Sequence, residues 1–397
     1  MVEVGIRLAA TFVAAALLIV ANPAALSDGP AERPVPSVAP LPSGAPSPTA
    51  SQAPTQPPPD YLLMPRAELQ ALPVTGSAWR YVVETANSAW PPPDINDQDS
   101  QTDTLALAAA LVYARTGDPV MRDKARDAIM AVIPTFEEPR LRSGLGPLRQ
   151  TAGWVLAADF IDLDGPDDAA FRRFLERLLT EPIGRHTRWN RVVATHDDSS
   201  NNWGAWAGAT RIAASLYLGR DVRDAVETVR GFLGDRRAWD GFNGQKDRLP
   251  RGARPWACDP SRAGFTPVNG ACERAGANLD GAVPADISRG RGSEPGSPSA
   301  TGVMYTLETL AGYTLQAELL YRNGYPDVYE ASDQALRRMA DFISRSEAAG
   351  GPGWNPGRVQ YHVPWLLNRR YGTDYPTVPA EYGRAFGYTD WLYGDAR

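Results

Sequence analysis

Apolar residues recur at helical spacing through most of the chain after residue 60, in segments that end at Gly or Pro. They form consecutive pairs joined by short turns, at 102–116 with 118–133, 148–163 with 167–179, 201–218 with 221–233, and 304–323 with 328–344. Helices of this kind bury their apolar faces by packing as hairpins side by side. No strand–helix alternation interrupts the pattern. We therefore expect an all-α domain, an incomplete α/α toroid of antiparallel helical hairpins with long irregular loops.

Two long stretches lack this periodicity and are expected to be irregular. Residues 236–300 are rich in Gly, Arg and Pro, and residues 347–397 are rich in Trp and Tyr. Loops of this length inside a domain usually carry function or are disordered. The first stretch contains the two cysteines of the chain, Cys258 and Cys272. Because no histidine lies near them, a disulfide that pins the loop is favoured over a zinc site.

The N-terminal part of the chain is typical of an exported protein. Residues 8–20 are uncharged and apolar, follow Arg7, and are shorter than the roughly 20 residues of a transmembrane helix. We interpret residues 1–28 as a signal peptide, with a retained N-terminal anchor as the alternative and as the only expected link to a membrane. Residues 29–60 have the composition of a Pro-rich disordered linker. Residues 61–397 then form one domain.

Charge and aromatic content narrow the class of ligand. A net charge of −6 excludes a typical nucleic-acid-binding protein, which carries a basic footprint. Residues 230–291 are locally basic, with eleven Lys/Arg against seven Asp/Glu, which suits either an anionic ligand or a solvated surface. The eleven Trp residues either fill the core or stack on sugar rings.

Three polar segments are the candidates for chemistry. Residues 196–206 place Asn201, Asn202, Trp203 and Trp206 at the start of an apolar helix, where the Asn side chains either cap the helix or bind a ligand. Residues 278–284 (NLDGAVP) are followed by Arg289 and Arg291, and the sequence leaves open which of the two acts. The third is Tyr305, at the start of the helix that reads MYTLETL, where it either packs or takes part in catalysis.

In this order, the paired Asn, the Asp-Gly-x-x-Pro stretch with its Arg, and the Tyr-x-x-x-x-Leu helix resemble the alginate lyase family of α/α-toroid polysaccharide lyases. The resemblance spans roughly residues 65–372. It implies β-elimination on an anionic, uronate-containing polysaccharide, with no metal or cofactor. Tyr305 would be the general acid and base. Asn202 and Arg289 would neutralise the substrate carboxylate.

The resemblance also implies the remaining site residues. Asn201, Trp203, Trp206, Arg291 and His362 would bind substrate. The family has His directly after the paired Asn, where this chain has Trp203. His196 is the candidate that replaces it in catalysis, and His362 is a second; the remaining histidine is His186.

Two other functions remain open at this point. A glycoside hydrolase would need two carboxylates about the scissile bond, and Asp197, Asp198, Asp280 and Glu381 are the available acids. A carbohydrate-binding protein that keeps the fold without catalysis is favoured by Trp203 and disfavoured by the retained Tyr305 and Asn202.

Overall fold

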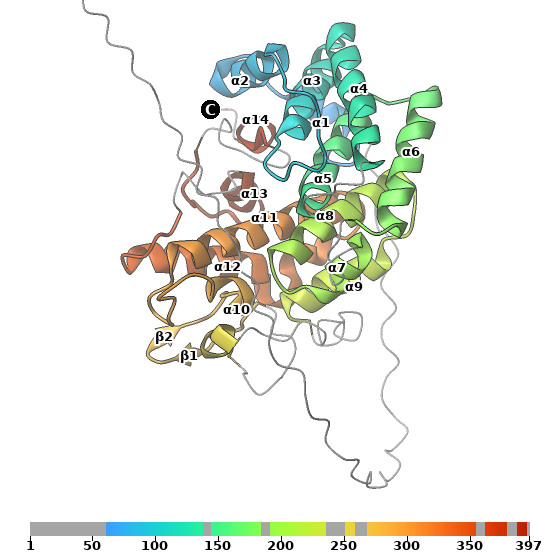
Figure 1. Cartoon of the computed structure of the whole chain (residues 1–397). Helices are drawn as coiled ribbons and strands as arrows, with labels where there is room; N and C mark the ends of the chain where they lie inside the picture. The colour runs from blue at the N-terminus through green and yellow to red at the C-terminus, as the bar shows by residue number, and fades with distance from the viewer. Residues whose placement is uncertain are drawn as a thin grey trace, which may run out of the picture. The chain divides into compact units, whose positions relative to one another are not determined.

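The structure is a computed structural model that describes residues 61–137, 144–183, 191–235, 251–258, 268–354, 362–378 and 387–394. Most of these residues are helical, which confirms the all-α class (Figure 1). The α-helices are α1 (Arg66–Ala71), α2 (Gly76–Asn87), α3 (Thr102–Thr116), α4 (Pro119–Val132), α5 (Leu145–Phe160), α6 (Gly165–Thr180), α7 (Val192–Asp198), α8 (Asn202–Tyr217), α9 (Arg223–Leu233), α10 (Pro284–Ile287), α11 (Ala300–Arg322), α12 (Ala331–Ala348), α13 (His362–Tyr371) and α14 (Thr389–Tyr393). Short 3₁₀ helices are η1 (Ile133–Glu137), η3 (Arg251–Trp256) and η4 (Pro326–Glu330), and β1 (Glu273–Arg274) pairs antiparallel with β2 (Ala277–Asn278).

The eight predicted helical segments are present as α3, α4, α5, α6, α8, α9, α11 and α12, with ends shifted by a few residues. The turn between α3 and α4 shows why these helix ends could be predicted from the sequence. Gly117 ends α3 in the left-handed conformation at a φ of 76°, and Asp118 caps α4 by accepting from the Val120 N–H at 2.9 Å. Pro119 occupies the first turn of α4, where its missing N–H costs nothing.

The helices divide into an inner and an outer row. The first helices of the hairpins, α3, α5, α8 and α11, pack against one another in chain order. They are apolar on nearly every side, as expected of helices surrounded by protein. The outer helices α4, α6, α9 and α12 each bury one face and expose the other. Among the hairpin helices, the inner row therefore buries more apolar side chains than the outer row.

Small residues set the distance between α8 and α11. A Cβ on Gly312 of α11 would lie 2.7 Å from the Cβ of Ala205, so a larger residue there would push the helices apart. Gln316, one turn further along α11, donates from Nε2 to the Ala205 carbonyl at 2.7 Å. These contacts fix α11, and with it Tyr305, relative to the start of α8.

Parts of the chain expected to be irregular are helical, so that prediction is corrected. Residues 347–397 contain α13 and α14, and residues 236–300 contain the one-turn helix α10. α13 and α14 are short, so the residues that they bury are too few to mark a helix by periodicity: Val363, Leu366 and Leu367 in α13, and Trp391, Leu392 and Tyr393 in α14. The indole of Trp391, for example, lies 4.8 Å from that of Trp79 in α2. Tertiary contacts, not periodicity, hold these helices.

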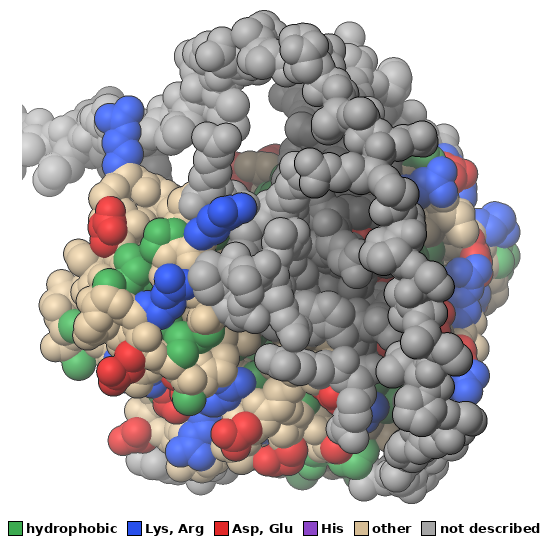
Figure 2. All heavy atoms as spheres, turned by 90° about the horizontal axis from the view of Figure 1, so that it is seen from below, with side chains coloured by type: hydrophobic (Ala, Val, Ile, Leu, Met, Phe, Trp, Pro, Cys, Tyr) green, Lys and Arg blue, Asp and Glu red, His purple; other side chains and the backbone are tan. Residues whose placement is uncertain are grey.

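The surface mixes both signs of charge. On the face seen in Figure 2, basic and acidic side chains of the described residues are interspersed. Several arginines of the locally basic stretch are paired, including Arg230 with Asp327 at 2.5 Å. Arg274 is likewise engaged, donating to the Ala257 carbonyl at 2.6 Å. These arginines therefore connect neighbouring segments of the fold.

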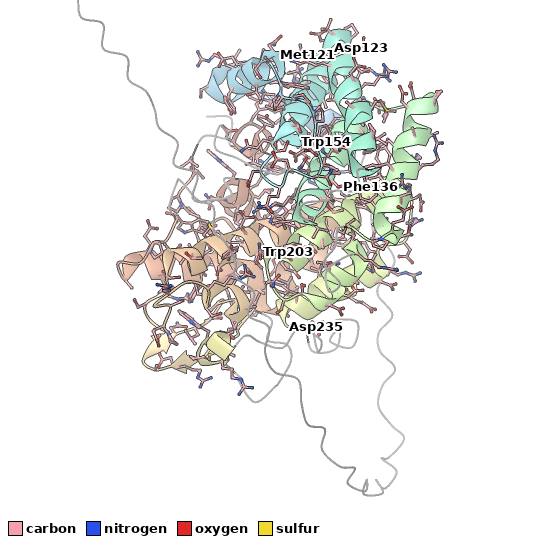
Figure 3. The ribbon with its side chains drawn as sticks, in the orientation of Figure 1. Met121, Asp123, Phe136, Trp154, Trp203 and Asp235 are labelled. Carbon is pink, nitrogen blue, oxygen red and sulfur yellow. A yellow bond between two sulfur atoms is a disulfide. The ribbon has the colours of Figure 1, made fainter. Side chains whose placement is uncertain are left out.

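Large aromatic side chains fill the interior. Figure 3 labels Trp154, which lies on α5 in the inner row and is completely buried. Phe232 of α9 stacks on Tyr313 of α11 with ring centroids 3.8 Å apart. Many of the aromatic residues thus fill the core, which was one of the two interpretations of the tryptophans.

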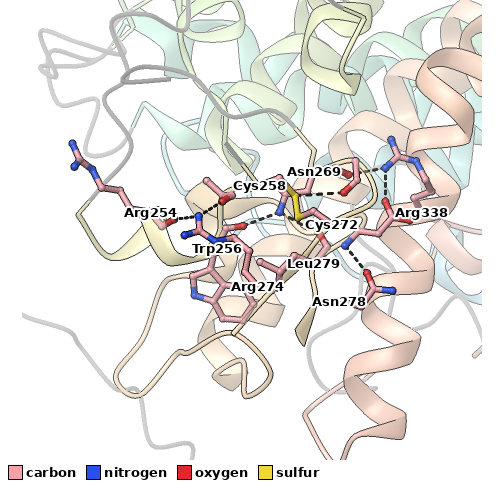
Figure 4. Close-up of a disulfide and its surroundings, with 12 residues drawn as sticks. Arg254, Trp256, Cys258, Asn269, Cys272, Arg274, Asn278, Leu279 and Arg338 are labelled. Carbon is pink, nitrogen blue, oxygen red and sulfur yellow. Dashed lines mark hydrogen bonds and ion pairs between the residues drawn. A yellow bond between two sulfur atoms is a disulfide. The ribbon is translucent and has the colours of Figure 1, made fainter. Parts of the chain in front are cut away.

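The predicted disulfide between Cys258 and Cys272 is present (Figure 4). Asn269 supports it by donating to the Trp256 carbonyl at 2.7 Å and accepting from the Cys258 N–H at 3.2 Å. Arg338 of α12 reaches across and donates to the Asn269 carbonyl at 2.6 Å. The segment that leads to α10 is therefore fastened to α12.

In the described part of the chain, no helix has both the length and the apolarity that crossing a bilayer requires. The predicted leader and the predicted linker fall in residues 1–60, outside the described residues.

Candidate functional site

A buried carboxylate joins two of the predicted site residues, Asn202 and Arg289. Asp286 of α10 is completely buried, and its Oδ2 accepts from the Asn202 backbone N–H at 3.0 Å and from the Thr309 hydroxyl. Its Oδ1 lies 3.5 Å from Nε of Arg289, one turn later. Burial raises the pKa of Asp286 to about 6, while the Arg289 cation and the two hydrogen bonds oppose that rise. The carboxylate thus binds the start of α8 to α10 and α11.

Asn201 and Asn202 have different roles at the start of α8. Asn201 is the N-cap, and its side-chain oxygen accepts from the Trp203 N–H at 2.9 Å. Asn202 is almost completely buried, and among the described residues its Oδ1 has no hydrogen-bond partner. A buried amide oxygen without a partner is costly. Asn202 is therefore the member of the pair suited to contact a ligand.

Arg289 lies over Tyr305. The guanidinium carbon is 4.1 Å from the centroid of the Tyr305 ring, and both side chains are partly exposed. The close approach of the two segments depends on Gly302, where a Cβ would lie 2.2 Å from the Ile287 carbonyl oxygen. Tyr305 itself lies in the second turn of α11, because this helix begins at Ala300, four residues earlier than predicted.

A second charged group adjoins this cluster. Glu308 lies three residues after Tyr305 on α11, so the two side chains occupy neighbouring positions on one helix face. Its Oε2 accepts from the indole N–H of Trp206 at 2.8 Å and pairs with Arg149 of α5 at 2.8 Å. Its negative charge also contributes to raising the pKa of Asp286. Trp206 is buried and fixes this carboxylate.

His196 lies apart from the contacts that join Asn202, Arg289 and Tyr305. It belongs to α7 and is completely buried, and Arg211 donates to its Nδ1 at 3.3 Å. Burial, reinforced by the Arg211 cation, lowers the pKa of His196 well below its usual value. The imidazole is therefore neutral with its proton on Nε2. The polar stretch that begins at His196 is divided between two elements: its first residues form the end of α7, and Asn201 caps α8, as one of the two interpretations held.

The other predicted site residues are dispersed. Trp203, in the first turn of α8, is half-buried and packs against the core (Figure 3). Arg291 is exposed. His362 begins α13, but its side chain lies outside the description, and His186 falls outside the described residues.

The acids considered for hydrolysis have structural partners. Asp197 accepts from Arg211 at 2.7 Å and from the Thr228 hydroxyl at 2.8 Å. Asp280 pairs with Arg338 at 2.6 Å. Asp198 ends α7, and Glu381 lies outside the described residues. No two of the described acids are joined across a cleft by these contacts.

Sequence reasoning missed Asp286 and Glu308. Both are acids inside otherwise apolar helical segments, which is a signal for a buried polar role because unpaired charges are rarely buried. No protein-family model and no curated protein matches this chain. The residues themselves therefore carry the functional argument.

Proposed function

We propose that this chain is an exported polysaccharide lyase that cleaves a uronate-containing polymer by β-elimination. The observation that carries the proposal is the stack of the Arg289 guanidinium on Tyr305, connected through Asp286 to the start of α8 at Asn202. It brings a phenol and a cation together at a partly exposed position and ties them, through the backbone of Asn202, to the helix start that carries the Asn202 amide. These are the groups that elimination next to a carboxylate requires.

The proposed chemistry needs no water and no metal. A base removes the proton at C5 of the uronate, the C4–O bond breaks, and the electrons form a C4=C5 double bond. Arg289 and the Asn202 amide would neutralise the substrate carboxylate, which lowers the cost of the charge that develops at C5. Tyr305 would take the C5 proton as a phenolate and deliver it to the leaving oxygen.

The helix arrangement is compatible with the proposed fold. We propose that the hairpins curve into an incomplete α/α toroid, because the inner helices α3, α5, α8 and α11 pack in chain order with the outer helices around them. Export rests on the leader and the linker in residues 1–60, and the disulfide suits an oxidising compartment.

A carbohydrate-binding protein without catalysis is the second candidate. Two observations favour it: Trp203 occupies the place of the family's histidine, and His196 is sealed in the interior. It predicts binding of a polyuronate with no change in the polymer.

The test is a panel of polyuronates and glycosaminoglycans incubated with the purified protein while ultraviolet absorbance is followed. A lyase produces an unsaturated sugar that absorbs, so absorbance should rise on at least one polymer. New reducing ends without absorbance would replace the proposal with hydrolysis. Binding with neither signal would favour the non-catalytic protein.

The buried Asp286 should give the proposed activity an acid limb. Its carboxyl takes up a proton as pH falls through about 6, and the attraction that orients Arg289 is then lost. We expect kcat/KM to fall as pH decreases through this range, and Asp286→Asn to show a low value without that limb. Rates from about pH 5 to about pH 8, with the exposed Asp221→Asn as control, measure this. An Asp286→Asn profile parallel to that of the wild type would contradict the assignment.

A further inference from the structure

A small recess adjoins Glu308, because two of its lining residues, Trp206 and Arg149, contact that carboxylate. Its lining residues come from the segment before α3, the start of α3, and helices α5 and α8. Among them are Gln98, Ser100, Gln101, Thr104, Gln150 and Trp206. Arg149 and Asp103 complete the lining.

Two buried polar atoms of the lining have no partner in the described part of the chain. Gln150 is 1% exposed, and its Nε2 donates to the carbonyls of Asp94 at 3.2 Å and Asp97 at 2.7 Å. These carbonyls fix the amide, so Oε1 is the atom left as an unused acceptor. The Nε of Arg149 is an unused donor in the same way. Leaving a buried donor and a buried acceptor unpaired is costly, so a polar molecule that reached them, whether water or a ligand hydroxyl, would be bound.

The charges at the recess decide which polar group fits. The Arg149 cation is matched by Glu308 at 2.8 Å, and Asp103 adds a negative charge that is nearly buried. No surplus positive charge remains among these groups to attract a carboxylate. The other lining groups are neutral amides and hydroxyls, which both donate and accept. Sugar hydroxyls have the same dual capacity.

The recess adjoins the cluster at Tyr305. Trp206 lines it and donates to Glu308, which follows Tyr305 by one helical turn on α11. Arg149 lines it and contacts the same carboxylate. Glu308 is therefore a common neighbour of the recess and of the Tyr305 cluster.

From this arrangement we propose that the recess binds the hydroxyl edge of the sugar residue next to the one that is cleaved. The assignment rests on the proposed function for its position and on the Gln150 and Arg149 atoms for its chemistry. Because the recess is small, a hydroxyl that carries an acetyl group does not enter it. The site therefore distinguishes polymers by O-acetylation.

The experiment measures binding without turnover. Tyr305→Phe protein is titrated calorimetrically with alginate, polygalacturonate and hyaluronan, each with free hydroxyls and after chemical O-acetylation. Gln150→Leu removes the buried acceptor. Gln101→Ala alters the rim, since Gln101 is exposed and makes no capping hydrogen bond at the start of α3. Thr75→Ala is the matched control, because Thr75 is exposed, precedes α2 in the same way and does not line the recess.

We expect acetylation to weaken binding of the parent protein. Gln150→Leu and Gln101→Ala should weaken binding of the free-hydroxyl polymer about three- to tenfold and leave the acetylated polymer unchanged. Thr75→Ala should match the parent on both. If circular dichroism shows that Gln150→Leu has lost helix, Gln101→Ala alone decides.

Equal affinities for the parent and the variants, or no binding of any polymer, would contradict the proposal that the recess binds a sugar residue. The absorbance assay on the wild-type protein separates this from failure of the lyase proposal. Product formation with unchanged affinities keeps the lyase and removes the recess. Weakened binding in the variants with no product from the wild type keeps the recess and removes the lyase.

Discussion

Tyr305→Phe should reduce the rate of elimination by about 10²- to 10⁴-fold, the usual contribution of a general acid or base. The change removes one oxygen and keeps the ring on which the Arg289 guanidinium stacks at 4.1 Å. Folding and substrate affinity should therefore change little. The measurement is kcat and KM by absorbance on the polymer that the panel identifies, and the loss should appear in kcat.

The chain offers a closely matched control on the same helix. Tyr321 of α11 also lies beneath an arginine, with the Arg370 guanidinium carbon 3.9 Å from its ring centroid. Tyr321→Phe removes the same atom from the same kind of stack, outside the contacts that join Asn202, Asp286 and Tyr305. It should keep nearly full activity. Equal rates for the two variants would remove Tyr305 from the chemistry.

Glu318→Ala should lower the free energy of unfolding by about 3–5 kcal/mol, because it takes a shared carboxylate away from two largely buried arginines. Glu318 is completely buried on α11 and accepts from Arg322 at 2.9 Å, from Arg370 of α13 and from the Tyr329 hydroxyl at 2.8 Å. Burial alone would raise the pKa of Glu318, but the two arginines outweigh it and hold the pKa below its usual value. Arg322 also pairs with Glu68 of α1 at 2.6 Å.

Urea unfolding followed by circular dichroism measures this loss. Asp221→Ala, which removes an exposed partner of Arg223, is the control and should cost less than about 1 kcal/mol. A loss for Glu318→Ala no larger than for Asp221→Ala would show that the cluster does not hold α1, α11 and α13 together.

The hairpin helices could be predicted because residues at their own ends start and stop them. Gly117, Asp118 and Pro119 end one helix and start the next by local geometry alone. The helices α13 and α14 could not be predicted in this way. They are short and depend on partners distant in sequence, as Arg370 depends on Glu318, 52 residues earlier. Such contacts leave no periodic signal in the chain.

Part of the candidate site could also be predicted from local features of the sequence. The order of polar segments singled out Asn202, Arg289 and Tyr305, and the structure connects them. The connecting group, Asp286, lies 84 residues from Asn202, and no local pattern pairs the two. The nearness of His196 to Asn202 in sequence gave no information on side-chain direction. In the structure that imidazole faces Arg211 in the interior.

The most direct test of the account is the mass of the cleavage products formed in water enriched in oxygen-18. Elimination consumes no water, so each cut should yield an unsaturated chain end without added oxygen-18. Loss of that product in Tyr305→Phe, but not in Tyr321→Phe, would place the chemistry at the Arg289–Tyr305 stack. Products with saturated non-reducing ends, each heavier by one water than the elimination product, would contradict the account, because hydrolysis adds water across the broken bond and forms no double bond.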